Sequence, residues 1–398
     1  MFLGYKRPDG KTGIRNYVLV LPVQRMVNSV AMQVSSMVRG AKTIVSTGEI
    51  GRSSKDRRTI ARTLTGLALN GNVGGVLIIG DDHYSSKELK HEEMAEIVRS
   101  TGKPVEVLDI TESGGYYNAI GIGAKMAQRL ALQISEFRRE QCDLKDLTLG
   151  VKCGTSDPTS GVAGNPVVGK AFDVLVNAGG TAFFSETTEV IGAEDKLAKR
   201  CINEQVKEKL LNAVSEIEEK ARATGEDIRN INPIPENVKA GISTLEEKSL
   251  GAITKSGSMP ILDVLTYGER PPGNGLYFID GWMSSLSLPL GMAAAGANLF
   301  MYQLGGQGMP DTLPPMPAYS AGIVTPMMYL TGNPRTCQKA EDFVDFCSGK
   351  IMEGKSSIEE MADKLLECVL DLASGTMTKT ETVNIQDPVE FYLEDPCF

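Results

Sequence analysis

Short apolar runs rich in β-branched residues alternate with helical patterns over the first third of the chain, and this alternation constrains the fold most. The runs expected to form buried strands are residues 17–23, 43–46, 73–80 and 104–110. The helical patterns that follow the first three runs cover residues 27–39, 55–70 and 86–101. Strand–helix–strand spacing of this kind predicts parallel βαβ units. In such a sheet, ligands bind beyond the carboxyl ends of the strands, which singles out residues 48–52 and 80–84.

The rest of the chain alternates less regularly. A helix is expected over residues 117–141, and a domain boundary follows its charged end. Strands are then expected at residues 147–153, 181–185, 275–279, 298–303 and 325–330. Helices are expected from residue 166 and over residues 193–223, 284–295, 335–346 and 358–373, with residues 222–243 as a connecting loop. The 398 residues suit two or three domains, so we predict an α/β protein with a parallel-sheet βαβ N-terminal domain (residues 1–143) and a second α/β domain (residues 144–398).

The charge balance and the apolar runs exclude some function classes. There are 41 Lys and Arg residues against 50 Asp and Glu residues, a net charge of −9, and an acidic chain is a poor candidate for nucleic-acid binding. The longest apolar runs, such as residues 291–297, are too short to span a membrane. Residues 1–6 lack the apolar core of a signal peptide, so we expect a cytoplasmic protein.

Cysteine and histidine usage narrows the chemistry further. The seven cysteines are scattered and form no CxxC motif, so neither a disulfide framework nor a zinc ribbon is expected, and most should be buried in a reducing compartment. The chain has two histidines, so a histidine-rich metal centre is excluded. A Ser-His-Asp triad would have to use His83 or His91.

The polar loop at residues 152–166 gives the strongest functional signal. It follows an expected buried strand, precedes an expected helix and contains Cys153, Ser156, Asp157, Ser160 and Asn165. Backbone N–H groups and a helix N-terminus at such a place favour an anion. The pattern is not that of a nucleotide P-loop. A polar βα turn with an asparagine cap is the alternative, and both interpretations remain open.

Three further segments carry candidate polar residues. Glu186 and Glu189 follow an expected strand; they suit a divalent cation or a general base, or equally a helix-capping box. Lys248 lies in TLEEKSLG (residues 244–251), which on its own is better explained as an exposed helical turn. Gln307 lies in a glycine cluster at residues 305–308, which is weak evidence for close approach of a ligand.

Two residues of the first third are also candidates. His83, beside Asp81 and Asp82, suits a proton carrier or a metal ligand, although a surface histidine is the commoner explanation. Arg52 suits a carboxylate or sulfonate, or belongs to a solvated basic helix face.

Taken together, these motifs resemble the altronate/galactarate dehydratase (UxaA-type) family. The resemblance rests on GYKR (residues 4–7), GIRN (residues 13–16), the loop from Cys153 to residue 166, SETTEVIGAE (residues 185–194) and TLEEKSLG. The family includes sugar-acid dehydratases and the large subunit of sulfolactate sulfo-lyase. Its dehydratases begin with a small SAF-type domain, and we expect this chain to be of the kind without it. The resemblance therefore implies a large subunit that acts with a separate small SAF-domain subunit, in a homo- or hetero-oligomer.

The family's chemistry implies β-elimination from a small 2-hydroxy carboxylate, which gives a 2-keto acid, with a divalent cation (Fe²⁺ or Mg²⁺). Arg52 and His83 stand where the sugar-acid dehydratases usually have cysteines, and Gln307 stands where they have arginine. These departures slightly favour loss of sulfite from sulfolactate over loss of water from a sugar acid. The segments around Glu186 and Lys248 are closer to the dehydratases, which keeps the sugar-acid alternative open.

The resemblance also suggests a role for each candidate. Arg52 would bind the sulfonate or carboxylate, and the loop with Ser156 and Asn165 would hold the other anion. Glu186 and Glu189 would bind the cation or supply the base, and His83 or Lys248 would carry a proton. The competing function class is a non-catalytic ligand-binding homologue.

Overall fold

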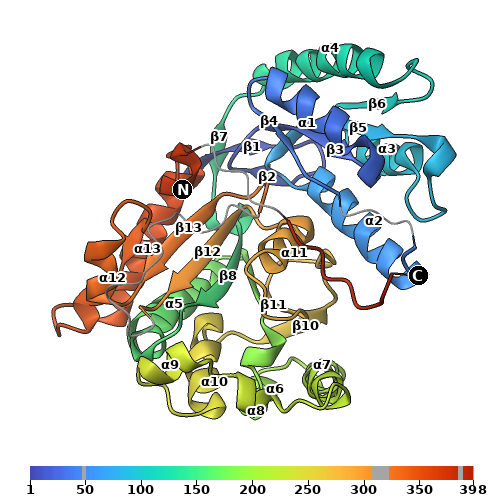
Figure 1. Ribbon diagram of the computed structural model, residues 1–398. Coiled ribbons are helices and arrows are strands. Elements are labelled where there is room, and N and C mark those ends of the chain that lie inside the picture. Colours follow the sequence, from blue (N-terminus) through green and yellow to red (C-terminus); the bar gives the residue numbers. More distant parts are fainter. Residues whose placement is uncertain (47–50, 307–321, 384–388, 398) are drawn as a thin grey trace.

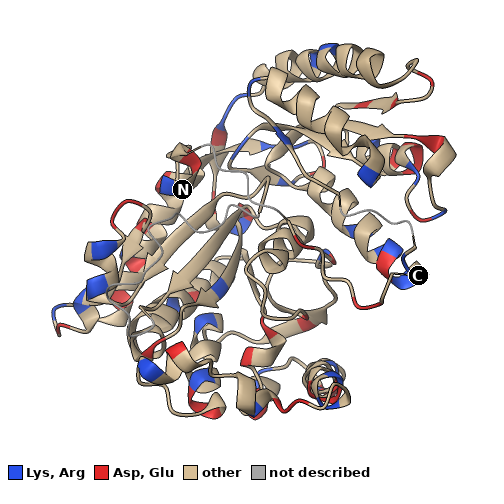
Figure 2. Cartoon of the chain, in the orientation of Figure 1, with Lys and Arg blue, Asp and Glu red and all other residues tan. Residues whose placement is uncertain are grey.

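The structure is a computed structural model that describes residues 1–46, 51–306, 322–383 and 389–397. It contains two parallel sheets, of four and seven strands, and a small three-stranded sheet between them (Figure 1). The predicted α/β class is confirmed. Acidic and basic residues are interspersed along the outer helices of both sheets (Figure 2).

The N-terminal sheet is parallel and covered on both faces. Its strands, in the order β4-β3-β5-β6, are β3 (Tyr17–Pro22), β4 (Ala41–Thr43), β5 (Val73–Gly80) and β6 (Val105–Asp109). Its helices are α1 (Asn28–Met37), α2 (Ser54–Leu69), α3 (His91–Arg99) and α4 (Tyr116–Ser135). Val18 and Val20 of β3 pack with α1 and α4, whereas Leu19 and Leu21 pack with α2 and α3. Both faces of the strand are buried, which explains its continuous apolar sequence.

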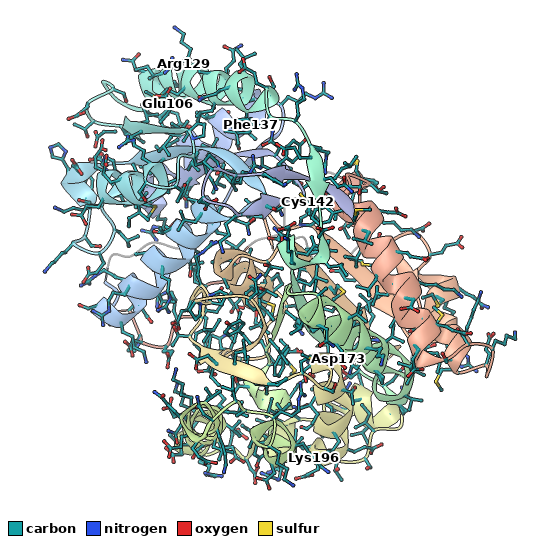
Figure 3. The ribbon with its side chains drawn as sticks, turned by 180° about the vertical axis from the view of Figure 1, so that it is seen from behind. Glu106, Arg129, Phe137, Cys142, Asp173 and Lys196 are labelled. Carbon is teal, nitrogen blue, oxygen red and sulfur yellow. A yellow bond between two sulfur atoms is a disulfide. The ribbon has the colours of Figure 1, made fainter. Side chains whose placement is uncertain are left out.

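An ion pair on the surface also joins α4 to β6. Arg129 of α4 and Glu106 of β6 point toward one another in the view from behind, with Nη2 and Oε1 3.1 Å apart (Figure 3). The Arg129 side chain is largely exposed and that of Glu106 is half-buried, so the pair adds little to stability.

The second sheet has seven parallel strands in the order β10-β11-β9-β8-β12-β13-β14. These are β8 (Thr148–Gly154), β9 (Thr181–Phe184), β10 (Ile261–Leu265), β11 (Leu276–Ile279), β12 (Leu299–Leu304), β13 (Met327–Thr331) and β14 (Phe346–Cys347). One face packs against α5 (Asn165–Asn177) and α13 (Ile358–Ala373), and the other against α11 (Ser287–Ala295). Strand β8 lies at the centre of the sheet, so the loop after it opens at the middle of the carboxyl edge.

The two sheets share buried contacts. Ile60 and Leu64 of α2 belong to the same apolar cluster as Leu290 and Ala293 of α11. The three-stranded sheet of β1 (Phe2–Lys6), β2 (Thr12–Gly13) and β7 (Glu140–Cys142) is antiparallel. Because one cluster runs through both parts, the division between residues 143 and 144 stays a prediction.

The structure corrects several predicted elements. The helix expected over residues 117–141 ends at Ser135, where the chain turns into β7. The helix expected over residues 193–223 is two helices, α6 (Glu194–Ala198) and α7 (Glu204–Ala223), because the intervening Cys201 forms a bridge to Ile261. The expected loop at residues 222–243 contains α8 (Ile228–Ile231) and α9 (Pro235–Lys239), and α12 is limited to Pro334–Lys339. Strands β1, β2, β7, β10 and β14 were not predicted.

The cysteine expectation also needs correction. Cys337 and Cys347 form a disulfide, with Cα atoms 5.9 Å apart, because α12 and β14 bring their backbones together. Scattered positions in the sequence gave no signal for this pair. None of the helices in the described residues has an apolar stretch sufficient to span a lipid bilayer.

Candidate active site

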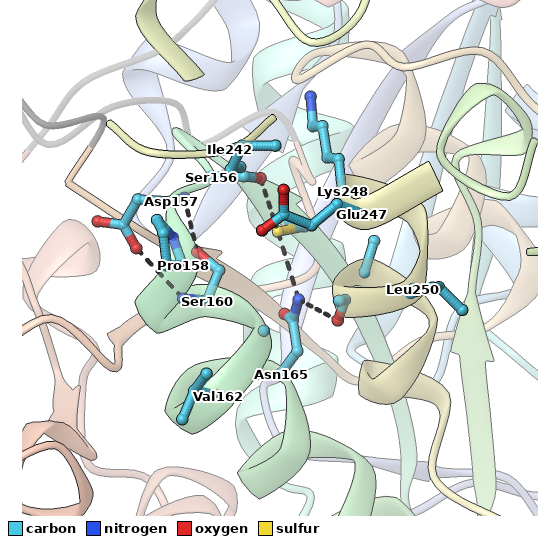
Figure 4. Close-up of a pocket in the computed structure, with 14 residues that line it drawn as sticks. Ser156, Asp157, Pro158, Ser160, Val162, Asn165, Ile242, Glu247, Lys248 and Leu250 are labelled. Carbon is cyan, nitrogen blue, oxygen red and sulfur yellow. Dashed lines mark hydrogen bonds between the residues drawn. The ribbon is translucent and has the colours of Figure 1, made fainter. Parts of the chain in front are cut away.

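A pocket of about 320 Å³ opens beyond the carboxyl end of β8, between the loop that leads into α5 and helix α10 (Leu245–Ile253) (Figure 4). The loop and α10 meet at Gly161 and Gly251, where a Cβ on Gly161 would lie 3.1 Å from the Cα of Gly251. Any larger residue there would push the two walls apart. The lining residues are Cys153, Ser156, Asp157, Pro158, Ser160, Gly161, Val162, Asn165, Ile242, Glu247, Lys248, Leu250, Gly251 and Ala252.

Cys153 lies in the pocket wall as a buried, hydrogen-bonded thiol. Its Sγ is 3.1 Å from Ser156 Oγ and accepts from Asn165 Nδ2 at 3.7 Å. Burial raises the pKa of the thiol to about 11, and the negative charge of Glu189 adds to this effect. Cys153 is therefore a neutral thiol at physiological pH, unlike a nucleophilic or metal-binding thiolate.

Asp157 lines the pocket, but its carboxylate is used to join three loops. Oδ1 accepts from Thr159 N at 2.9 Å, Thr159 Oγ1 at 2.5 Å and Ser160 N at 3.2 Å. Oδ2 accepts from Gly306 N at 2.7 Å and Asn333 Nδ2 at 2.8 Å. These bonds connect the loops after β8, β12 and β13, so Asp157 acts on the pocket mainly by positioning its walls.

Glu186 lies behind the pocket, at the end of β9, and its carboxylate is surrounded by cations. Oε1 accepts from Lys152 Nζ at 2.9 Å, and Oε2 accepts from Lys255 Nζ at 2.5 Å and from the backbone N–H of Cys153 at 2.8 Å. Burial alone would raise the pKa of Glu186, but the charges of Lys152 and Lys255 lower it to about 2. Burial opposes the charged form of each lysine as well, and the attraction of Glu186 outweighs it, so both lysine pKa values lie above the ordinary value.

The backbone at these strand ends is strained. Glu186 has φ 80° and Thr155 has φ 46°, values that non-glycine residues rarely adopt. Each costs about 1–3 kcal/mol and persists only where surrounding contacts enforce it. The ion pairs of Glu186 provide such contacts, and strain of this kind is typical of functional sites.

Glu189 and Lys248 extend this charged cluster to the pocket. Glu189 Oε2 accepts from Lys255 Nζ at 3.1 Å, and Glu189 Oε1 lies 3.7 Å from Lys248 Nζ. Lys248 also donates to Asn232 Oδ1 at 2.7 Å and Asn237 Oδ1 at 3.1 Å. The sequence favoured an exposed turn here, but Lys248 is only 7% exposed and faces inward. We define the lysine cluster as Lys152, Lys248 and Lys255 with Glu186 and Glu189; three ammonium groups against two carboxylates give it a formal charge of +1.

The lysine cluster does not fit a divalent cation. Both oxygens of Glu186 and Oε2 of Glu189 already accept from ammonium groups, and a cation would have to displace these and add two positive charges to a positive cluster. An anion next to the cluster is electrostatically favoured instead.

Several buried polar atoms around the pocket lack a protein partner, namely Thr155 Oγ1, Asn165 Oδ1, Asn232 Nδ2 and Ser249 Oγ. Native structures satisfy most buried polar groups, so such a concentration indicates groups that meet a ligand or water. Asn165, which is 1% exposed and lines the pocket, is the clearest case.

Two family models match the chain. The one described as D-galactarate/altronate dehydratase, C-terminal, matches residues 144–394, and the one described as D-galactarate dehydratase/altronate hydrolase, second domain, matches residues 4–135. The chain belongs to the D-galactarate/altronate dehydratase family. The predicted resemblance is thus confirmed.

Individual relatives of the dehydratase family are similar over most of the chain. The β subunit of (2R)-sulfolactate sulfo-lyase from Chromohalobacter salexigens is 34% identical over 389 residues, which cover 96% of this chain and 95% of that protein. Galactarate dehydratase (L-threo-forming) from Escherichia coli is 31% identical over 79% of this chain and 59% of its own length. Altronate dehydratase from Bacillus subtilis is 27% identical over 96% of this chain and 75% of its own length. These relatives are lyases, and this member of the family is an enzyme of that class.

Only some of the site residues predicted from the sequence lie at the pocket of this family member. Cys153, Ser156, Asp157, Ser160, Asn165 and Lys248 line it, and Glu186 and Glu189 lie behind it. Arg52 precedes α2 and His83 follows β5, both beside the N-terminal sheet, and neither is among the lining residues. Arg52 Nη1 donates to Asp395 O at 3.3 Å, and His83 is largely exposed beside Asp81. Gln307 lies outside the described residues.

The sequence analysis did not identify five residues of the site and its surroundings, namely Lys152, Lys255, Asn232, Asn237 and Gln303. Lys152 carried a usable signal, because a lysine within the apolar strand TLGVKCG requires a buried counter-ion. Gln303, within the fully buried β12, is a similar case: its side chain occupies the space next to Gly164, and its Oε1 lies 3.7 Å from Cys153 Sγ. Lys255 and the two asparagines lie in turns and short helices, where polar residues are normally solvated.

Proposed function

We propose that this chain is the catalytic subunit of a lyase that eliminates a β-substituent from a small 2-hydroxy carboxylate and so yields a 2-keto acid. In the favoured version the substrate is (2R)-sulfolactate and the products are pyruvate and sulfite. The observation that carries the proposal is the pocket itself, because it adjoins a buried cluster of net positive charge. The carboxylates of Asp157 and Glu247 in its wall already accept hydrogen bonds from N–H and O–H groups, so the pocket suits a substrate with two anionic groups.

The reaction places clear demands on the site. A base removes the proton on the carbon next to the carboxylate, and the C–S bond then breaks, with its electron pair leaving on sulfite. The resulting enol takes up a proton at the β-carbon and becomes the keto acid. Negative charge builds up on the carboxylate during proton removal, and fixed positive groups nearby stabilise it. Lys152 and Lys255 supply this field from behind β8.

Lys248 is the proposed proton carrier, since its ammonium group belongs to the cluster and its side chain lines the pocket. Glu186 stays a candidate base, but two ammonium groups and one N–H reduce its basicity. Ser156, Ser160 and Asn165 are proposed to bind the substrate's anionic groups. The substrate-binding roles of Arg52 and Gln307 and the proton-transfer role of His83 stay predictions.

The relatives support the sulfite version over the water version. The sulfo-lyase β subunit has the higher identity, 34% against 31% and 27%, and aligns over 95% of its own length. Chemically, sulfite leaves as a stable anion and needs only a positive, donor-lined pocket, whereas hydroxide also needs a general acid. Loss of water from a sugar acid is the alternative, supported by the dehydratase relatives and the 185–194 segment.

The name of the sulfo-lyase relative, a β subunit, supports the proposal that this chain acts with a second chain. We propose a small SAF-type subunit as that partner, in a cytoplasmic homo- or hetero-oligomer.

The test is incubation of the chain and the small SAF-type subunit with Mg²⁺ or Fe²⁺ and, in separate reactions, (2R)-sulfolactate, altronate or galactarate. The favoured version predicts equal amounts of pyruvate and sulfite. A keto-deoxy acid from a sugar acid alone would support the dehydratase version. Saturable binding without any product would contradict both and support the non-catalytic homologue.

A further inference from the structure

The carboxyl edge of the N-terminal sheet holds a second group of chemically competent side chains. β5 and β6 are adjacent parallel strands, and Gly80 at the end of β5 pairs with Asp109 at the end of β6. Asp82 follows β5 in the short helix Asp82–Tyr84, and His91 begins α3. Both histidines of the chain, His83 and His91, therefore lie at this one edge.

Asp82, His91 and Asp109 converge at a single point. Each offers one possible ligand atom, and the three atoms lie within 4.8 Å of one another. His91 Nδ1 is 3.5 Å from Asp82 Oδ1, and the other ring nitrogen, Nε2, is 3.9 Å from Asp109 Oδ2. A shared ion would bind one of these two nitrogens. Ligand atoms about 2.1 Å from a metal ion are separated by about 3–4 Å, so the three ligand atoms, now within 4.8 Å, would have to move closer together, and rotation of the exposed Asp82 side chain allows this.

The imidazole of His91 is held in place but has an unused nitrogen. It is 2% exposed, and its Nδ1 is buried without a hydrogen-bond partner. A Cβ on Gly80 would lie 2.4 Å from Nδ1, so the glycine is what allows the ring to pack against β5. A buried imidazole nitrogen that faces a carboxylate without hydrogen bonding to it is well placed to bind a metal ion.

The carboxylates are oriented by the backbone. Asp109 Oδ1 accepts from Glu112 N and Oδ2 accepts from Asp82 N, both at 2.9 Å, and these bonds leave lone pairs on both oxygens. The Asp82 side chain is 67% exposed, which gives an ion access from solvent. In contrast to the lysine cluster, no lysine or arginine pairs with Asp82 or Asp109 within the described residues.

We propose that Asp82, His91 and Asp109 bind one divalent transition-metal ion. One imidazole nitrogen and two carboxylate oxygens suit Mn²⁺, Fe²⁺ or Zn²⁺, with water in the remaining positions. The site lies at the other sheet from the pocket and does not depend on the proposed reaction, so it is distinct from the cation site predicted at Glu186 and Glu189.

The test uses the full-length chain after treatment with a chelator and dialysis, titrated with Mn²⁺ alone while free Mn²⁺ is followed by electron paramagnetic resonance. Wild type is expected to bind one equivalent. Asp82→Asn changes an exposed ligand, so it should have little effect on folding stability. It is expected to weaken Mn²⁺ binding at least tenfold. His91→Asn is expected to abolish saturable binding. Glu93→Gln, an exposed acid on the same helix, is the matched control and should change affinity less than threefold.

A fourth variant, Glu186→Gln, separates the two candidate locations. We expect it to retain Mn²⁺ binding. Loss of binding in Glu186→Gln but not in Asp82→Asn would return the ion to the lysine cluster and overturn the proposal. Absence of saturable binding by wild type up to 1 mM Mn²⁺ would also overturn it. Since Asp82 is exposed, the proposal remains testable if His91→Asn fails to fold.

Discussion

The two parallel sheets end in similar polar segments, but their carboxylates meet different partners. At the seven-stranded sheet, Glu186 and Glu189 are buried against ammonium groups. At the four-stranded sheet, Asp82 and Asp109 face an imidazole, and Asp82 is largely exposed. The sequence pattern, acids after a strand, is the same in both places. What differs is the group that another segment brings to the edge.

This difference determines what each edge can bind. Lys255 comes from the turn after α10, far along the chain from Glu186, and makes the edge suitable for anions. His91 comes from the next helix and leaves its edge negative, which suits a cation. In our two proposals, anion binding and cation binding thus lie at different sheets. The predictions below test this contrast through the strength and environment of the ion pairs.

The largest effect is expected from Lys255→Met, which removes an ammonium group that is 2% exposed and bonded to two carboxylates. Breaking a buried ion pair from one side typically costs about 3–5 kcal/mol, because the other charge stays buried without a partner. Urea-induced unfolding should show that the free energy of unfolding of Lys255→Met is lower than that of wild type by this amount. The double variant Glu186→Gln/Lys255→Met should be less destabilised than the sum of its single variants.

Lys207→Met is the control for that experiment, because Lys207 pairs with Glu204 on the surface. Its loss should be below about 1 kcal/mol. If Lys255→Met lowered the free energy of unfolding by an equally small amount, the lysine cluster would be solvated. The two sheets would then not differ in the burial of their carboxylates.

The next effect concerns activity. Lys248→Met removes the charge of the lysine cluster that lines the pocket. Loss of a charged or donor group that stabilises a transition state typically lowers the rate by about 10²–10³-fold. We expect kcat/KM for (2R)-sulfolactate, the proposed substrate, to fall at least 10²-fold. Lys170→Met, on the exposed side of α5, should leave kcat/KM unchanged. Equal activity of the two variants would contradict a role for the cluster in catalysis.

The third effect is on pH dependence. The pKa of Glu186 is about 2 in the folded chain, below its ordinary value of 4.5, so the native state binds fewer protons than the unfolded state between these values. Its stabilising contribution is therefore complete above pH 4.5 and is lost as the pH falls toward 2. About 2 kcal/mol should be lost by pH 3, and Glu186→Gln should lack this component.

Thermal unfolding of wild type and Glu186→Gln from pH 7 to pH 3 measures this component. The difference between them should narrow below pH 4.5, and Glu219→Gln on the exposed face of α7 should run parallel to wild type. A constant difference across the range would show that Glu186 does not titrate as part of the cluster.

Much of the fold could be predicted from the sequence because local patterns agree with the tertiary structure. Residues 73–80 and 358–373 were predicted with the bounds that the structure gives. The strand is apolar throughout, and the helix starts at Ser357 with a capping box to Glu360. Where a tertiary contact overrides the local pattern, prediction failed: the charged run at residues 193–223 suggests one helix, but the bridge of Cys201 to β10 interrupts it.

The pocket loop was identifiable for the same reason, since Cys153, Ser156 and Asn165 follow one strand and start one helix. The lysine cluster was not, because Lys152, Lys255 and Glu186 come from three segments that are adjacent only in the folded chain. These charged residues act together because they are buried, whereas charged residues in a sequence are normally expected to be exposed to solvent.

The smallest effect is expected at the N-terminal sheet, where Arg57 of α2 pairs with Glu88 at 2.8 Å. The two side chains are 26% and 17% exposed, so water reaches the pair and Glu88→Gln should cost less than about 1 kcal/mol. The Debye length falls from about 10 Å at 0.1 M salt to about 3 Å at 1 M, so the cost should shrink further at high salt. The loss in Lys255→Met should stay nearly constant, because buried pairs are screened much less. Urea unfolding of both variants at the two salt concentrations compares them directly. If both losses fell equally with salt, burial would not be what distinguishes the two edges.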